Sequence, residues 1–389
     1  MDIKAVRNDT RGCTGKIFLN SAGSSLVPDA VFDKVMNYLT EEAKVGGYAL
    51  AAAHLQETEE FYKEAAILLN CKPKNMAFQT SATDAYAKAL SAIDFKAGDV
   101  ILTTDDDYVS NQISFISLRK RLGIRIVRAV NLPDGDLDLL AFEEMVKAYR
   151  PKLIAITHIP TSSGLVQAVE AVGVICRKYE VWYLLDACQS VGQLVVDTKK
   201  IGCDFLTATG RKFLRGPRGT GFLYVSDRAL EAGLAPLLMD MQGAKWTAAD
   251  DYELEPSAKR FEYWESSIAG RIGLKEALHY ANTIGMANIE QYNAELMKQF
   301  RSRLRQIKGL NLQDRGSCVS SILTFTMDHH SLEEIAEQLR VHHVYFSMSF
   351  KGSAMLDFAK KNIDSAIRLS PHYFNTTEEL EKVVTILDF

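Results

Sequence analysis

Three polar side chains come directly after predicted strands in the middle of the chain. Asp186 ends one apolar run, His158 follows the run that ends at residue 157, and Lys212 follows the run that ends near residue 209. In an open parallel sheet, ligands bind beyond the carboxyl ends of the strands. The three residues would therefore bring a carboxylate, an imidazole and an amine to one edge of the sheet, where a lysine can serve in covalent chemistry.

Lys212 stands in the stretch TGRKFLRGPRGTGFLYV at 209–225, which holds one lysine among three arginines and four glycines. A solvated basic turn is the plain interpretation, and a lysine held for covalent chemistry is the alternative. Each of the three side chains also has an ordinary structural interpretation, since an aspartate at a strand end commonly caps a helix. Their combination in this order favours chemistry.

The elements that must position these side chains form an alternating pattern. Continuous apolar strands separated by helices predict an α/β fold, with a mostly parallel seven-stranded sheet and helices on both faces. We assign it to a large cofactor-binding domain at 20–255. The expected strands lie at 100–104, 124–130, 152–157, 181–186, 205–209 and 221–225, and the expected helices at 111–122, 141–149 and 169–179.

The pattern of predicted helices and strands changes after about residue 255. Long helical patterns at 268–284 and 289–306 precede short strands at 319–325 and 366–370 and a last helix at 377–387. This succession predicts a smaller C-terminal α+β domain, formed by 1–19 together with 256–389.

Composition narrows the class of protein. The 389 residues carry a net charge of −4, so electrostatics give no reason to expect nucleic acid. No apolar run reaches the length of a membrane span, and the first residues lack the apolar core of a signal peptide. Six cysteines are scattered singly, which argues against zinc or a disulfide framework. We expect a cytoplasmic enzyme with no metal, no membrane contact and no nucleic-acid partner.

An aspartate at one strand end and a lysine 26 residues later form the layout of fold type I enzymes that use pyridoxal 5'-phosphate. The amine forms a Schiff base with the cofactor aldehyde, and the carboxylate keeps the pyridine nitrogen protonated. Along nearly its whole length the chain resembles the class V aminotransferase family. The resemblance rests on LNSAG near residue 20, TSATDAY at 80–86, DDYVSNQISF at 106–115, THIPTSSG at 157–164, DACQSVGQ at 186–193, TGRKFLRGPRGTGFLYV at 209–225 and IRLSPHYFNTTEEL at 367–380.

The resemblance implies a role for each matching residue at the cofactor ring. Lys212 would be the Schiff-base lysine, and Asp186 would pair with the pyridine nitrogen. Gln189 would contact the ring hydroxyl, Tyr108 would cover the ring, and His158 would lie near the cofactor. Ordinary core packing is the alternative for Tyr108.

The resemblance also implies a phosphate site. Ser81, Ala82 and Thr83 open a helix whose backbone N–H groups suit a phosphate, and a plain helix cap is the alternative. Thr209 and Arg211 match the family's phosphate ligands. Arg211 departs from the histidine that cysteine desulfurases carry there, but its permanent charge suits the same role.

Further matches concern the substrate and the assembly. Arg368 matches the arginine that binds the substrate α-carboxylate, and Asn20 would line the same pocket. A structural salt bridge is the alternative for Arg368. The family forms homodimers with active sites between subunits, and 260–270 is the segment that would cross the interface. A serine-capped helix start within one chain is the alternative for that segment.

The reaction is the least determined feature. Cysteine desulfurases need a nucleophilic cysteine shortly before the carboxylate-binding arginine, whereas 346–356 contains none. Sequence likeness at 209–225 and 260–274 indicates a resemblance to the isopenicillin N epimerase and ergothioneine-pathway C–S lyase branch of the family. We therefore expect a carbon–sulfur lyase that cleaves a cysteine S-conjugate or its sulfoxide by β-elimination, giving pyruvate, ammonia and a sulfur product.

Three alternatives remain open at this point. The same residues could serve an aminotransferase or an epimerase acting on an amino acid. Cysteine desulfuration ranks below these because of the missing cysteine. A cofactor-binding protein without activity is the remaining alternative, and the presence of Lys212, Asp186 and Arg368 argues against it.

Overall fold

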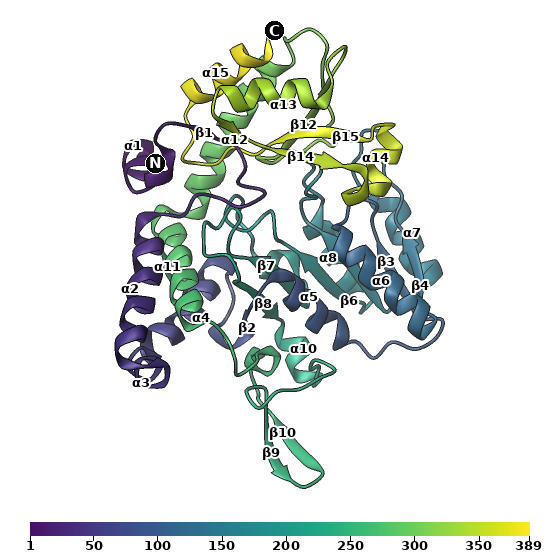
Figure 1. Ribbon diagram of the computed structural model, residues 1–389. Coiled ribbons are helices and arrows are strands. Elements are labelled where there is room, and N and C mark those ends of the chain that lie inside the picture. The colour runs from purple at the N-terminus through teal and green to yellow at the C-terminus, as the bar shows by residue number, and fades with distance from the viewer.

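The computed structural model describes residues 1–389, and its centre is a seven-stranded sheet (Figure 1). The strand order is β2-β8-β7-β6-β5-β3-β4, and all neighbours run parallel except β8, which is antiparallel to both β2 and β7. The predicted α/β fold with a mostly parallel seven-stranded sheet is therefore confirmed. The strands are β2 Met76–Gln79, β3 Val100–Thr103, β4 Arg125–Arg128, β5 Leu153–Thr157, β6 Trp182–Asp186, β7 Phe205–Thr209 and β8 Gly221–Val225.

Both faces of the central sheet are covered. Alternate residues of each strand point to opposite faces, so each strand contributes to two clusters of core residues. Ile154 and Leu185 belong to the larger core cluster, with Val172 of α8, whereas Ala155 and Leu184 pack with Ala85 of α5. This explains why the strands read as continuous apolar runs. The helices of this part are α5 Ala82–Ser91, α6 Val109–Leu122, α7 Leu139–Tyr149, α8 Val169–Lys178, α9 Thr198–Ile201 and α10 Asp227–Glu231.

A second, four-stranded antiparallel sheet lies above the first in Figure 1, in the order β11-β12-β15-β14. The strand predicted at 319–325 begins later, because Val319 forms an isolated bridge with Leu165 instead. The elements are β11 Leu310–Leu312, β12 Leu323–Met327, β13 Val344–Tyr345, β14 Ser347–Phe350, β15 Ser365–Leu369, α12 Met286–Leu304, α13 Leu332–Val341, α14 Met355–Lys361 and α15 Thr377–Leu387.

The N-terminal residues join the second sheet's region. Strand β1, Ile17–Phe18, pairs in parallel with β13, and Arg7 forms a 2.8 Å ion pair with Glu379. These contacts agree with grouping 1–19 with the C-terminal part, although the domain boundaries themselves stay a prediction. The remaining elements are α1 Ile3–Asn8, α2 Asp29–Val45, α3 Gly47–Ala53, α4 Leu55–Leu69, α11 Ile268–Ile284, the hairpin β9 Ala244–Ala248 and β10 Asp251–Leu254, and the 3-10 helices η1 Arg11–Cys13, η2 Pro73–Asn75, η3 Ala258–Phe261 and η4 Lys351–Ser353.

The register of the central sheet gathers the predicted chemistry at one edge. Thr157 pairs with Asp186, and Asp186 pairs with Thr207, so the carboxyl ends of β5, β6 and β7 lie side by side. Because β8 returns antiparallel to β7, the connection at 210–220 that carries Lys212 lies at the same edge.

Two general properties of the chain concern the membrane and the cysteines. None of the helices combines the length and the apolar character that a bilayer span requires. All six cysteines are free thiols. A cytoplasmic location stays a prediction.

Helix α8 approaches α9 so closely that a side chain at Gly173 has no room. A Cβ atom at this position would lie 1.7 Å from the carbonyl oxygen of Ile201. We predict that Gly173→Ala lowers the free energy of unfolding by about 2–4 kcal/mol, because backbone must move to admit the methyl group. Urea denaturation followed by circular dichroism measures this.

Gly352→Ala is the matched control, since a Cβ there meets no atom within 4 Å. We expect the control to change stability by no more than about 0.5 kcal/mol. Equal effects of the two substitutions would contradict the close helix contact.

Candidate active site

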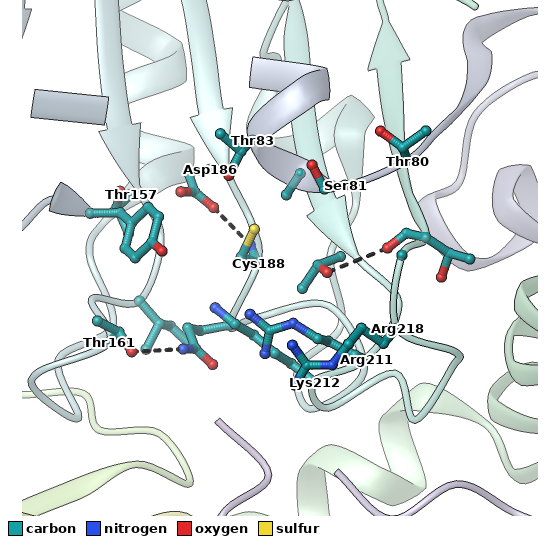
Figure 2. Close-up of a pocket in the computed structure, with 17 residues that line it drawn as sticks. Thr80, Ser81, Thr83, Thr157, Thr161, Asp186, Cys188, Arg211, Lys212 and Arg218 are labelled. Atoms are coloured by element: carbon teal, nitrogen blue, oxygen red, sulfur yellow. Dashed lines mark hydrogen bonds between the residues drawn. The ribbon is translucent and has the colours of Figure 1, made fainter. Parts of the chain in front are cut away.

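A cavity of about 240 Å³ opens at the carboxyl edge of the central sheet (Figure 2). Every residue predicted to bind the cofactor lines it, with the exception of His158. Those that line it are Ser81, Ala82, Thr83, Tyr108, Asp186, Gln189, Thr209, Arg211 and Lys212.

Lys212 lies buried at the floor of this cavity, only 8% exposed. Its Nζ atom is 5.8 Å from the centroid of the Tyr108 ring. Burial lowers the pKa of Lys212, and the guanidiniums of Arg211 and Arg368 act in the same direction. A lowered pKa makes the neutral, nucleophilic amine easier to reach near neutral pH.

Asp186 presents a fixed carboxylate on the opposite side of the cavity. Its Oδ1 atom accepts a hydrogen bond from the Cys188 backbone N–H at 2.9 Å, as Figure 2 shows. Its Oδ2 atom accepts one from Asn111 Nδ2 at 3.0 Å. Two donors on two oxygens fix the orientation of the carboxylate.

One end of the cavity is built for an anion. Ser81 caps α5 and accepts a hydrogen bond from the Asp84 N–H at 3.1 Å, so the helix N-terminus faces the cavity. Arg211 and Arg218 line the same cavity, and in the view of Figure 2 they lie across it from Ser81. A Cβ on Gly221 would lie 2.9 Å from the Ser81 carbonyl carbon, so glycine at the start of β8 lets α5 approach.

At the other end, Arg368 of β15 reaches the cavity from the second sheet. Its Nη1 atom donates to Thr161 Oγ1 at 2.6 Å, and Nη2 donates to Asn20 Oδ1 at 3.4 Å. Thr161 lines the cavity, whereas Arg368 and Asn20 lie beside it. Burial, with the charge of Arg211, lowers the pKa of Arg368 to about 10.

Two of the buried polar atoms that have no hydrogen-bond partner belong to residues at the end of the cavity near Arg368. They are Arg368 Nε, a donor, and Gln189 Oε1, an acceptor. Gln189 is otherwise held firmly, because its Nε2 atom donates to Thr161 Oγ1 at 3.1 Å and to the Ala22 carbonyl at 3.2 Å. Unpaired buried groups are costly, so a bound ligand that supplies partners would bind favourably here.

His158 lies beside Asp186 but does not line the cavity. Its backbone N–H donates to the Asp186 carbonyl at 2.9 Å, and its Nδ1 atom is buried without a partner. Burial lowers the pKa of His158 to about 4, so the ring is neutral at physiological pH.

Sequence reasoning missed several residues of the cavity wall. Thr157 and Thr161 lie in the quoted motif THIPTSSG, and Arg218 lies in TGRKFLRGPRGTGFLYV, so their motifs carried the signal. Cys188, in the motif DACQSVGQ, also lines the cavity.

The three arginines of the stretch at 209–225 have different surroundings. Arg215 does not face the cavity with the other arginines; it is fully buried and points toward the N- and C-terminal segments. Its Nη2 atom donates to Thr10 Oγ1 at 2.6 Å, and its guanidinium packs 4.9 Å from the ring centroids of both Tyr373 and Phe374. Aromatic rings and buried acceptors hold this cation in place of a phosphate.

Comparison with known proteins bears on family and activity. The family model for aminotransferase class V matches residues 17–383. A probable cysteine desulfurase of Methanothermobacter thermautotrophicus is 28% identical over 388 residues, covering 98% of this chain and 96% of that protein.

Solved structures agree with this likeness. The apo structure of a cysteine desulfurase from Thermococcus onnurineus NA1 has a TM-score of 0.90 and 25% identity, covering 99% of this chain and 97% of that chain. A C-DES mutant with glycine covalently linked to its PLP cofactor has a TM-score of 0.87 over 98% of this chain and 99% of that chain. At 20% identity, that second structure shows the fold alone.

These findings correct two expectations. The relatives are named cysteine desulfurases, so placement in the isopenicillin N epimerase and C–S lyase branch is not supported. The expectation of β-elimination from a cysteine S-conjugate was wrong, and the aminotransferase alternative is not favoured either. The choice of that branch rested on sequence likeness at 209–225 and 260–274. These segments contribute to the cavity wall and to the start of α11, and likeness there did not identify the reaction.

The buried His158 makes stability depend on pH. Its folded pKa of about 4 lies below the ordinary value of 6.5, so the unfolded chain binds the proton more readily. The stabilising contribution is therefore complete above about pH 6.5 and is lost as the pH falls toward 4. We predict that wild type loses about 3 kcal/mol from this group between pH 7 and pH 4.

His158→Gln should flatten that part of the profile, measured as the free energy of unfolding by urea at each pH. His342→Gln, at an exposed position, is the matched control and should keep the wild-type slope. A slope for His158→Gln equal to that of wild type would contradict the prediction.

Proposed function

Because the chain belongs to the aminotransferase class V family, we propose that it is an enzyme that removes sulfur from cysteine. Pyridoxal 5'-phosphate is its cofactor. The observation that carries the proposal is that Lys212 and Asp186 line one cavity while Arg368 lies beside it, bonded to the cavity residue Thr161, in a chain related over nearly its full length to probable cysteine desulfurases.

The residues present fit this cofactor. The N-terminus of α5, with Arg211 and Arg218, suits the phosphate, and the free Gln189 Oε1 atom suits the ring hydroxyl. Asp186 would face the ring nitrogen, and Tyr108 would cover the ring. When bound, the cofactor supplies an electron-accepting ring that stabilises negative charge at the substrate Cα.

Lys212 would hold the cofactor through its amine and then move the proton at the substrate Cα. Its lowered pKa supports both tasks, because each requires the neutral amine. Asp186, fixed by its two donors, would keep the ring nitrogen protonated.

Arg368 would bind the α-carboxylate of cysteine. Its guanidinium is oriented by Thr161 and Asn20, and its Nε atom remains free to donate. A planar guanidinium can bind a carboxylate through two parallel hydrogen bonds, which orients the substrate as well as holding it. Together the guanidiniums of Arg211, Arg218 and Arg368 match the negative charge of one phosphate and one carboxylate.

The sulfur acceptor is where this chain departs from the desulfurase pattern. The segment 346–356 forms β14, η4 and the start of α14 without a cysteine. Burial, with the nearby charge of Asp186, raises the pKa of Cys188 well above its ordinary value, so its thiol is a poor nucleophile. We propose that an external thiol takes the sulfur: cysteine and R–SH give alanine and the persulfide R–S–SH, as the Cβ–S bond breaks and Cβ gains a proton.

The test is turnover of cysteine with dithiothreitol as the thiol, measuring alanine by amino-acid analysis and sulfide by colorimetry. We predict that Lys212→Ala lowers the rate by roughly a thousandfold, because no other amine can move the proton. Arg368→Lys should raise KM roughly tenfold by removing the two-pronged carboxylate contact. Cys188→Ser should retain most of the activity.

Two results would contradict the proposal. Wild type with bound cofactor that forms no alanine from cysteine would exclude desulfuration. Loss of activity in Cys188→Ser, with cofactor binding intact, would exclude an external thiol as the first acceptor.

We further propose that two copies of the chain form a homodimer that closes the cavity. In one copy the phosphate end is open, with Thr83 and Arg218 exposed. A groove of about 720 Å³ runs between α2, α3, α4 and the exposed segment 263–267, and it presents the large side chains of Tyr48 and Trp264. Ser267 also caps α11 by accepting a hydrogen bond from the Gly270 N–H, so the alternative intrachain role is present as well.

Charge in this groove should separate the copies. We predict that Trp264→Glu raises the dimer dissociation constant by at least roughly tenfold, since large aromatic side chains dominate interface energies. Analytical ultracentrifugation measures the effect. Leu140→Glu, exposed on α7, is the matched control and should leave the association unchanged. A monomeric wild type at micromolar concentration would refute the dimer.

A further inference from the structure

A single buried amide joins two carboxylates beneath the cavity. Asn111, in the first turn of α6 and 3% exposed, uses its Nδ2 atom twice. It donates to Asp186 Oδ2 at 3.0 Å and to Asp107 Oδ1 at 2.9 Å. Both amide hydrogens are therefore committed to negative oxygens, which form strong charge-assisted bonds.

Asp107 is the fixed end of this chain of contacts. Its Oδ1 atom also accepts the Tyr108 backbone N–H at 2.7 Å and the Thr157 hydroxyl. Its Oδ2 atom accepts Gln112 Nε2 at 2.8 Å. The residue keeps some exposed surface, while its carboxylate lies deep enough for burial to raise its pKa.

These donors fix the direction of the Asn111 amide. Turning the amide over would place its carbonyl oxygen against both Asp107 and Asp186, where acceptors would repel one another. Because Asp107 is held by α6 and by the end of β5, it prevents that reversal. Asn111 is the side-chain donor to the Asp186 Oδ2 atom.

We propose that Asn111 and Asp107 are positioning residues that hold the Asp186 carboxylate toward the cofactor ring nitrogen, an inference that rests on the proposed function. Neither side chain lines the cavity, so both act through Asp186. Asp107 adds a second negative charge behind the amide. That charge favours a positively charged, protonated ring nitrogen on the far side of Asp186.

The experiment uses full-length apoprotein reconstituted with pyridoxal 5'-phosphate labelled with ¹⁵N in the ring. The ¹⁵N chemical shift reports protonation of the ring nitrogen, and fluorescence titration gives the cofactor dissociation constant. The variants are Asn111→Ala and Asp107→Asn, the second of which removes charge while keeping the shape. Ser114→Ala is the matched control, since its hydroxyl bonds only the Ser110 carbonyl on the same helix.

In wild type and in Ser114→Ala we expect a protonated ring nitrogen at neutral pH. In Asn111→Ala and Asp107→Asn the shift should move toward that of a neutral ring, and the dissociation constant should rise on the order of tenfold. With cysteine, kcat should fall while KM changes little, because Arg368 is untouched.

Each other outcome has a defined meaning. If wild type binds the cofactor with a protonated ring and both variants match it, the positioning role is refuted while the proposed function stands. If wild type does not bind the cofactor, the positioning role and the proposed function are both refuted. Should Asn111→Ala misfold, Asp107→Asn alone decides through the same two measurements.

Discussion

The structure depends on one constraint, the burial of a carboxylate at the end of a buried strand. Asp186 is 5% exposed, and a charge in that position requires donors fixed nearby. The turn after β6 provides one through the Cys188 N–H, and α6 provides the other through Asn111. The packing of α6 against the sheet edge is therefore tied to the same group that would face the cofactor.

Positive charge on the opposite side of the cavity complements this carboxylate. Lys212, Arg211, Arg218 and Arg368 surround a small volume, and burial lowers the pKa values of Lys212 and Arg368. Such a concentration of cations is tolerable when anionic ligands enter, as a phosphate and a carboxylate would. Arg215 lies outside this group, because the Leu26 carbonyl, Thr10 and two aromatic rings hold its guanidinium elsewhere.

The two sheets supply different parts of the candidate site. The central sheet supplies the groups that would hold the cofactor, whereas β15 of the second sheet supplies Arg368 for the substrate. The segment at 346–364 before β15 contains no cysteine, so under the proposed function the sulfur would pass to an acceptor outside this segment. A missing acceptor changes the fate of sulfur without altering the residues that would activate Cα.

The sequence alone was sufficient to locate every strand of the central sheet except β2, and to bring Lys212 and Asp186 to one edge of that sheet. Buried parallel strands read as continuous apolar runs, and Lys212 and Asp186 stand at strand ends within motifs, so local patterns identify them. Cofactor-site motifs did not identify the reaction, because they record how a cofactor is held and not which sulfur group leaves.

Only the tertiary structure decided how distant residues combine. Arg368 meets Thr161 across 207 residues, Asn111 meets Asp186 across 75, and Arg215 turns away from a stretch in which three arginines look alike. These outcomes follow from packing between segments that are distant in the sequence and from the hydrogen bonds that their buried polar groups form. The local spacing of residues encodes neither the packing nor these hydrogen bonds, because both depend on which surfaces meet once the chain has folded.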